Sequence, residues 1–382
     1  MTEFVSDAVE PESADDVPAK PPGYWKSLTH PTRRGWMLII ATLTTLVLLG
    51  VAFLMPVPFV KLAPGPTFNV IGEVDGQHVI EISGTKTYPT NGNLDMVTVL
   101  ESGGPRGGLT FVDAIASWLN PSDAVVPREL LFPDDETGED VEQKQAISFS
   151  TSQSDAIAAA MNYLKKPVVS QIVVTAVYAE SPSDGKLQPR DELLKVDGTE
   201  ITSPDQVAVA VRGKPIGTTF TFTINRDGEE QQVDVTSEPN PDDATVPYIG
   251  IGVGVFYSAE FPINFTLQDV GGPSAGLMFT TGIIDMLTPG DLTGGKYIAG
   301  TGTIAPDGTV GPIGGIRQKL AGARNNGATL FLMPQSHCEE AAGHVPDGLT
   351  VVPIKTLSDA ISSIENYVAG KPLASCPAAD VS

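Results

Sequence analysis

A serine lies in a run of small residues at 269–276, DVGGPSAG. Small neighbours let the backbone turn sharply at Ser274 and let a substrate carbonyl approach closely. The serine comes where a helix is expected to begin, over 274–287. Unpaired N–H groups at a helix start point outward, as an oxyanion requires. Gly272 and the amides near Ser274 are therefore candidate oxyanion or substrate contacts. The alternative is a Gly-rich turn with Ser274 as a plain N-cap.

A lysine follows 45 residues later (319 minus 274), on a second expected helix over 316–325. The sequence at 311–320 is GPIGGIRQKL, so Lys319 neighbours the apolar residues Ile316 and Leu320. A serine hydroxyl needs a base to become nucleophilic, and burial can lower the pKa of a lysine enough to supply one. Ser–Lys pairs are a known variant of the catalytic triad. The alternative is a solvated surface lysine.

Taken together, GPSAG and TGTIAPDGTVGPIGGIRQKL resemble the proteolytic domain of Lon peptidases. The resemblance covers about residues 249–368. It implies that Ser274 is the nucleophile and Lys319 its base, and that Thr301 lies near the lysine. It also implies a homo-oligomer, because such domains commonly form hexamers, although no ring interface is evident in the residues.

The sequence departs from that family at two positions. The family often has an acidic residue just before GPSAG, where this chain has Gly271 and, two residues earlier, Asp269. Thr303 stands where the family commonly has Glu. Neither departure removes the Ser–Lys pair, but both leave the substrate preference open.

Residues 168–238 resemble a PDZ domain. Their expected strands surround a short helix over 203–212, and VYAESPSDGKLQPRDELLKVDGTEI is similar to a segment of bacterial PDZ domains. Asp227 and Gly228 favour a hairpin turn. Arg190 replaces a usual glycine, and the segment 249–252 is a candidate for a displaced carboxylate-binding loop. Such domains capture extended peptides at a sheet edge. The alternative is a β-rich spacer.

The remaining segments are expected to complete a discontinuous fold. Short strands are expected over 68–101 after a turn or linker at 63–66, then a helix over 111–119, a Pro- and acid-rich loop over 121–142 and a helix over 150–164. The predicted class is α+β, a Lon-type domain with an inserted PDZ-like module. The predicted parts are a tail (1–35), a transmembrane helix (36–55), the first part of the Lon-type domain (65–165), the PDZ-like domain (168–240), the catalytic part (245–370) and a C-terminal tail (371–382).

Residues 36–55 form an uncharged, mostly apolar run, long enough to cross a bilayer as a helix. Lys26, Arg33 and Arg34 precede it, so the N-terminus is expected in the cytoplasm and the rest outside the plasma membrane. Residues 1–22 are acidic and Pro-rich, typical of a disordered tail. A cleaved signal peptide is the alternative, but the leader is long and no clear cleavage site follows.

The composition and motifs argue against nucleic acid, ATP and metal ions as partners or cofactors. The net charge is −23, which argues against nucleic-acid binding. The segment 290–297 nearly fits a phosphate-binding loop, but Tyr297 occupies the position of the magnesium-binding Ser or Thr. We therefore expect no ATP and an ATP-independent reaction. The two cysteines, Cys338 and Cys376, make no zinc site, and the sequence leaves open whether they form a disulfide. No metal or organic cofactor is expected.

The expected function is endopeptidase cleavage of exported or membrane-associated proteins and peptides by Ser274 and Lys319. Two alternatives stay open. GPSAG also fits the GxSxG elbow of α/β-hydrolases, with His337 or His344 completing an esterase triad, although no buried strand leads into the elbow. The chain could also be a non-catalytic protein that holds peptides through its PDZ unit.

Overall fold

The computed structural model describes residues 32–132, 137–226, 228–267 and 270–377. Several predictions lie outside these residues, namely the tail at 1–22, Lys26, Asp227 of the hairpin turn and Asp269. The chain divides into two units, residues 1–55 and 56–382.

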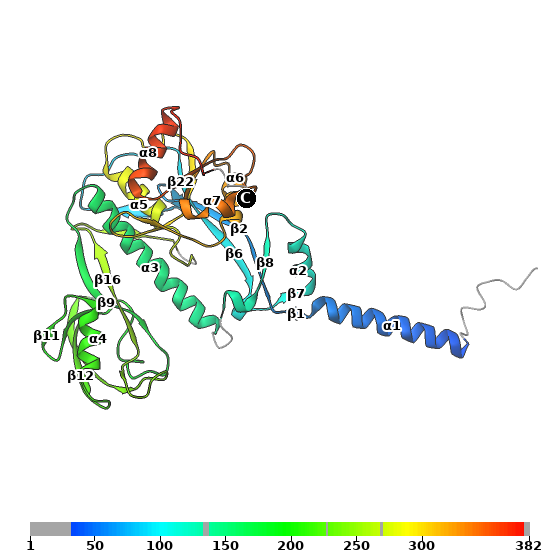
Figure 1. The fold of residues 1–382 in the computed structure, drawn as a ribbon, viewed down its shortest axis with the longest axis horizontal. Coiled ribbons are helices and arrows are strands. Elements are labelled where there is room, and N and C mark those ends of the chain that lie inside the picture. Colours follow the sequence, from blue (N-terminus) through cyan, green and yellow to red (C-terminus); the bar gives the residue numbers. More distant parts are fainter. Residues whose placement is uncertain (1–31, 133–136, 227, 268–269, 378–382) are drawn as a thin grey trace, which may run out of the picture. The chain divides into compact units, whose positions relative to one another are not determined.

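Helix α1 (Arg33–Leu54) forms the described part of the first unit (Figure 1). Thr32 caps it by accepting a hydrogen bond from the Gly35 N–H at 3.3 Å. The helix has a mean hydropathy of 2.6 and none of its residues is buried. Among the described residues it is the one helix long and apolar enough to cross a membrane, judged by length and composition.

The second unit contains a mixed sheet in the order β22-β21-β18-β6-β2-β8. Strand β6 is parallel to β18 along residues 93–96, and antiparallel to β2 over most of its length. The strands are β2 (Phe59–Asn69), β6 (Asn93–Gly103), β8 (Ala124–Pro127), β18 (Tyr297–Gly300), β21 (Leu330–Pro334) and β22 (Thr350–Ile354).

Side chains of this sheet alternate between two cores, as the two-residue period of a strand dictates. Leu330 and Leu332 pack with α3, α5 and α8, whereas Phe331 and Met333 pack with α6. Helices therefore cover both faces of the sheet. They are α6 (Ile316–Asn325) on one face, and α3 (Gly138–Tyr163), α5 (Gly276–Leu287) and α8 (Leu357–Val368) on the other.

A second sheet has the order β13-β12-β10-β9-β16, and Phe220, Phe222 and Ile224 are fully buried in its core. Its strands and helix are β9 (Val169–Val177), β10 (Glu192–Val196), β12 (Thr219–Arg226), β13 (Glu229–Thr236), β16 (Ile251–Ser258) and α4 (Pro204–Arg212). Arg190 has a φ of 77°, the left-handed conformation that favours the glycine expected there.

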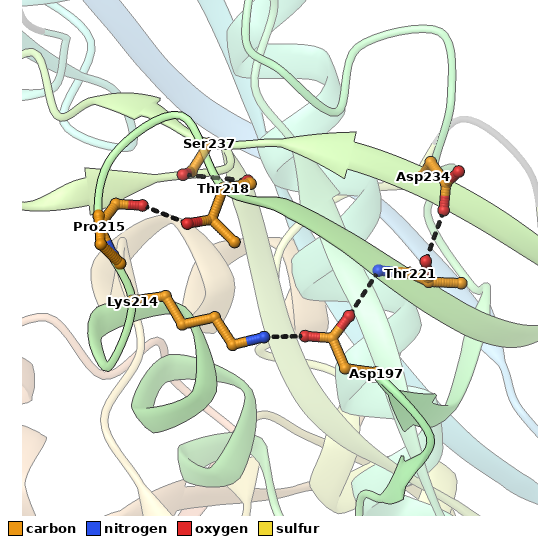
Figure 2. Close-up of polar contacts among 7 residues, drawn as sticks. All are labelled: Asp197, Lys214, Pro215, Thr218, Thr221, Asp234 and Ser237. Atoms are coloured by element: carbon orange, nitrogen blue, oxygen red, sulfur yellow. Dashed lines mark hydrogen bonds and ion pairs between the residues drawn. The ribbon is translucent and has the colours of Figure 1, made fainter.

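Polar contacts fix the turns of this second sheet (Figure 2). Asp197 accepts hydrogen bonds from Lys214 Nζ at 2.5 Å and from the Thr221 N–H at 2.9 Å. Both bonds lower the pKa of Asp197, and the bond from Lys214 has the larger effect. Thr221 Oγ1 in turn donates to Asp234 at 2.7 Å. One carboxylate therefore links the turn after β10 to β12 and to the segment after α4.

Short elements complete the second unit. They are β1 (Pro56–Val57) paired with β7 (Leu109–Thr110), β3 (Glu73–Val74) with β4 (Gln77–His78), β5 (Ile80–Ile82) with β17 (Ile263–Phe265), β10 with β11 (Thr199–Glu200), β14 (Glu238–Pro239) with β15 (Pro247–Tyr248), β19 (Thr303–Ile304) with β20 (Val310–Gly311), the helices α2 (Phe111–Trp118) and α7 (Cys338–Ala341), and the 3-10 turns η2 (Gly104–Arg106), η3 (Arg128–Leu130) and η4 (Gln335–His337).

Two local predictions were wrong. The segment 63–66 is not a linker but lies within β2, where the register with β6 shifts between Pro64 and Thr67, a bulge that accommodates prolines lacking an N–H. The loop expected over 121–142 contains β8 and the start of α3, which begins at Gly138 and not at Ser150. Thr137 and Asp140 form a capping box that starts this helix.

Candidate functional site

Residues 270–275, which we call the serine loop, contact α3 on one side and the segment after strand β18 on the other. Ser274 is half-buried and stands two residues before α5, which begins at Gly276 and not at Ser274 as predicted. The Ser274 carbonyl accepts hydrogen bonds from the Gly302 N–H at 2.9 Å and from Thr301 Oγ1 at 3.1 Å. These bonds tie the serine backbone to the segment after β18.

Helix α3 holds the other side of the loop. Ser152 Oγ donates to the Pro273 carbonyl at 2.9 Å, and the Gly272 N–H donates to the Gln145 carbonyl at 3.1 Å. Gly276 allows this close approach, because a Cβ there would lie 2.8 Å from Ser152 Oγ. No sequence pattern predicted these α3 contacts, although the Thr-x-x-Asp pattern at 137–140 would have extended the predicted helix to include Gln145.

Lys319 reaches Ser274 from the opposite face of the sheet. It lies in the first turns of α6, after Gly315, whose φ of 68° turns the chain into the helix. Lys319 Nζ is 2.7 Å from Ser274 Oγ and 3.0 Å from Thr301 Oγ1. The structure thus brings Ser274, Thr301 and Lys319 together at the carboxyl end of β18.

The environment of Lys319 favours the neutral amine. The residue is 3% exposed, and burial lowers its pKa from 10.5 to about 7. No carboxylate within the described residues forms an ion pair with its Nζ to offset that burial. At neutral pH a large fraction of the amine can therefore accept a proton.

Thr301 is fully buried and is held by its own backbone as well as by its side chain. Its N–H donates to the Leu332 carbonyl at 3.0 Å. The hydroxyl donates to the Ser274 carbonyl and lies near Lys319 Nζ, so it orients both partners. Thr301 is therefore placed to position Ser274 and Lys319 relative to each other.

Gly272 lines the same groove, but its N–H is engaged with Gln145. In this arrangement Gly272 therefore has no free amide to offer an oxyanion. The N–H groups of Ser274 and Ala275 donate to no acceptor within the described residues. They are the better-placed amides for an oxyanion, and sequence reasoning had not singled out Ala275.

The pair opens into a groove of about 1070 Å³. One wall is strand β6 from Val97 to Glu101, and other walls are the serine loop and residues 312–315. Among the described residues, β6 pairs with β18 only along 93–96. The edge of β6 that faces away from β2 therefore has no strand partner beyond Met96.

His337, the candidate base of the esterase alternative, forms its hydrogen bonds with Ile313 and Glu340. Its Nε2 accepts a hydrogen bond from the Ile313 N–H at 2.9 Å, and its Nδ1 lies 3.2 Å from a Glu340 carboxylate oxygen. The ring therefore holds the 312–315 wall of the groove. Within the described residues no group of three or more His, Cys, Asp or Glu side chains is arranged to hold a metal ion.

Comparison with protein families gives two matches. Residues 267–365 match the Lon protease (S16) C-terminal proteolytic domain, and residues 146–236 match a PDZ domain. The first match contains both Ser274 and Lys319.

Individual relatives agree with these matches. A Lon protease of Elusimicrobium minutum is 33% identical over 119 residues, covering 29% of this chain and 14% of that protein. A Lon protease of Clostridium beijerinckii is 36% identical over 113 residues, covering 26% and 14%. A mitochondrial Lon protease homolog of Debaryomyces hansenii is 32% identical over 96 residues, covering 24% and 9%. The chain thus spans only 9–14% of the length of these relatives.

Solved PDZ structures are also similar to part of the chain. The PDZ domain of the SdrC-like protein of Listeria innocua is 19% identical and covers 22% of this chain and 92% of that chain, with a TM-score of 0.20. A solution structure from Geobacillus thermodenitrificans is 24% identical and covers 22% and 94%, with a TM-score of 0.20.

Proposed function

We propose that this chain, which carries a Lon-type proteolytic domain and a PDZ domain in an α+β fold, is a membrane-anchored, ATP-independent serine endopeptidase. One observation carries the proposal. Lys319 Nζ lies 2.7 Å from Ser274 Oγ, in surroundings that lower the pKa of the lysine to about 7. A buried neutral amine in contact with a hydroxyl is the arrangement that activates a serine without histidine.

The proposed reaction follows from these contacts. Neutral Lys319 takes the proton of Ser274 Oγ as the oxygen attacks the peptide carbonyl carbon. The amides of Ser274 and Ala275 stabilise the oxyanion. The Lys319 ammonium then protonates the leaving amine, and the peptide C–N bond breaks. Lys319 next takes a proton from water, whose oxygen attacks the acyl ester. The acyl C–O bond then breaks to release the acid, and the Lys319 ammonium returns its proton to Ser274 Oγ. No metal or cofactor takes part.

The groove supports an extended peptide as the substrate. The unpaired edge of β6 can pair with a substrate strand, as peptide-binding domains do at a sheet edge. The groove also reaches Gly108, where an added Cβ would lie 2.6 Å from Pro56 Cβ. Because Pro56 follows the proposed membrane span almost directly, we include membrane-associated proteins and exported segments near the bilayer among the substrates.

The proposal includes a discontinuous catalytic domain. The PDZ-like module (168–240) is inserted between the two parts of the catalytic domain (65–165 and 245–370) and presents peptides for cleavage. Residues 36–55 cross the plasma membrane with the N-terminus in the cytoplasm. Arg33 and Arg34 beside the helix support that orientation.

Matched variants test the catalytic pair. Ser274→Ala and Lys319→Ala should each lower cleavage of an unfolded protein at least about 1,000-fold, because the two residues act as one unit. Lys371→Ala changes an exposed lysine outside the groove and should leave the rate unchanged. A serine-directed phosphonate should label Ser274 in the unmodified protein, as mapped by mass spectrometry.

Three outcomes separate the alternatives. Unchanged cleavage in both Ser274→Ala and Lys319→Ala would rule out this enzyme. Loss of cleavage with retained peptide binding would separate catalysis from capture by the PDZ-like module. Loss of activity in His337→Ala without loss of folding would favour an esterase-like triad over the lysine.

A further inference from the structure

Helix α2 presents large apolar side chains to solvent, and Ser117 is its one buried residue. Ile115 and Val112 are 41% and 45% exposed, Leu119, just past the end of the helix, is 72% exposed, and Trp118 is 78% exposed. Ser117, by contrast, is 2% exposed. A helix at the surface of a soluble protein normally has the reverse pattern, with the large apolar residues against the core. We call Val112, Ile115, Trp118 and Leu119 the α2 surface.

The α2 surface is fixed close to the point where the chain leaves the proposed membrane span. Helix α1 ends at Leu54, and Pro56 pairs with Thr110, the N-cap of α2. Paired residues in antiparallel strands have Cα atoms about 5 Å apart, and consecutive Cα atoms are about 4 Å apart. The N-cap of α2 therefore lies beside Pro56, which follows the last residue of α1 by two positions in the chain.

The chemistry of the α2 surface fits a lipid interface. Trp is enriched where a membrane meets water, and amphipathic helices lie there with their apolar face toward the acyl chains. The one acidic residue of α2, Asp113, accepts a hydrogen bond from Thr110 Oγ1 at 2.6 Å. The helix has no lysine or arginine and the chain has a net charge of −23, so apolar contact, and not attraction to anionic lipid, must supply the binding.

A further large apolar side chain is exposed in a segment that follows a strand packed against α2. Strand β8, against which α2 packs, leads into η3, where Leu130 is 71% exposed. Scattered exposed apolar residues are ordinary, but several large ones on one short helix indicate an interaction site. Because Pro56, just after the proposed membrane span in the chain, pairs with the N-cap of α2, lipid is the partner that the chain order favours.

We infer that α2 lies in the interfacial layer of the leaflet from which α1 emerges, with the α2 surface in contact with lipid. The inference rests on the membrane anchor of the proposed function. It adds a second membrane contact beside α1. Because Gly107 and Gly108, just before β7 and α2, line the groove, this contact also holds that part of the groove near the bilayer surface.

Tryptophan fluorescence tests the inference in the full chain. The chain has three tryptophans, at positions 25, 36 and 118. The variant Trp25→Phe/Trp36→Phe leaves Trp118 as the sole reporter. In nanodiscs of zwitterionic phosphatidylcholine, brominated near the headgroup end of the acyl chains, we expect a blue-shifted Trp118 emission that loses most of its intensity. Acrylamide in the water should quench it weakly.

A matched control places the reporter far from α2 in the sequence. Val209 on α4 is 70% exposed, so Val209→Trp with all three native tryptophans changed to Phe should respond to acrylamide and not to brominated lipid. Trp25→Phe/Trp118→Phe leaves Trp36 on α1 and reports the anchor alone. Quenching of Trp36 but not Trp118 by lipid would overturn the α2 contact and keep the anchor.

Two other outcomes also overturn the inference. If lipid quenches neither Trp36 nor Trp118, the anchor and the α2 contact both fail. If Trp118 loses its blue shift when each nanodisc holds a single chain, a second copy of the protein covers the α2 surface and lipid does not. Lipid quenching that persists at one chain per nanodisc supports the inference.

Discussion

At the scale of single residues, the proposed reaction depends on the protonation of Lys319. Burial lowers the pKa of this lysine to about 7, and only the neutral amine can accept the serine proton. The rate should therefore rise with pH through about 7 and level off above about pH 8. Below pH 7 it should fall tenfold for each pH unit. An exposed lysine would place the same rise near pH 10.

The measurement is kcat/KM for cleavage of a fluorogenic peptide between pH 5 and 10, which reports groups of the free enzyme. Lys319→Arg is the control, since arginine stays protonated and should be inactive over the whole range. A flat profile from pH 5 to 9, or a rise centred near pH 10, would contradict a buried lysine base.

The side chains that meet at the candidate site could be proposed from the sequence. Ser274 and Lys319 were identified by residue type, small neighbours and spacing, and Thr301 by resemblance. The free amide of Ala275 and the engaged amide of Gly272 could not be predicted, because they depend on which N–H group meets the Gln145 carbonyl of α3. Such a contact across more than a hundred residues has no local pattern.

At the scale of elements, α3 shows why sequence reasoning placed a helix start wrongly. Ser150, Ser152 and Ser154 resemble the polar start of a helix, yet they lie inside one. Ser152 and Ser154 are 4% and 3% exposed because each bonds a different neighbour. Ser152 Oγ donates to Pro273 of the serine loop, and Ser154 Oγ accepts from the Tyr257 N–H of β16 at 2.6 Å. Buried hydroxyls with distant partners look like caps in a sequence.

These two serines provide a matched test of how α3 supports the reaction. Ser152→Ala and Ser154→Ala each remove one part-buried hydrogen bond to the backbone, which should lower the free energy of unfolding by about 1 kcal/mol. Only Ser152 touches the serine loop, so Ser152→Ala should slow phosphonate labelling of Ser274 several-fold. Ser154→Ala should leave labelling unchanged.

The measurements are thermal unfolding and the rate of Ser274 labelling in both variants. Equal slowing of labelling in the two variants would mean that general destabilisation, and not support of the loop, explains the effect. Faster labelling in Ser152→Ala would mean that α3 restrains the serine.

At the scale of the whole molecule, the existence of a strand was easier to predict than the sheet to which it belongs. The expected strand over 249–256 exists, but β16 pairs with β9 and joins the second sheet, next to the segment matched as a PDZ domain. Pairing between strands more than seventy residues apart follows from tertiary packing, which a strand's own period does not encode. The edges of the proposed domains therefore could not be placed from local patterns.

The disulfide tests the orientation of the chain in the membrane. Cys338 and Cys376 are bonded, closing a loop with a sequence separation of 38 residues, and both pack against the core beneath α6. Disulfides persist in oxidising compartments and are rare in the cytoplasm. If the second unit is exported, protein isolated with N-ethylmaleimide present should gain no maleimide. After denaturation and reduction it should gain two, as read by mass spectrometry.

Cys338→Ser/Cys376→Ser gains no maleimide under either condition and controls for other reactive groups. Loss of the bridge should also lower stability by up to about 4 kcal/mol, the loop entropy expected for this separation, because the unfolded chain is then less constrained. Two maleimides on the unreduced protein would place the second unit in a reducing compartment. The N-terminus would then lie outside, against the bias set by Arg33 and Arg34.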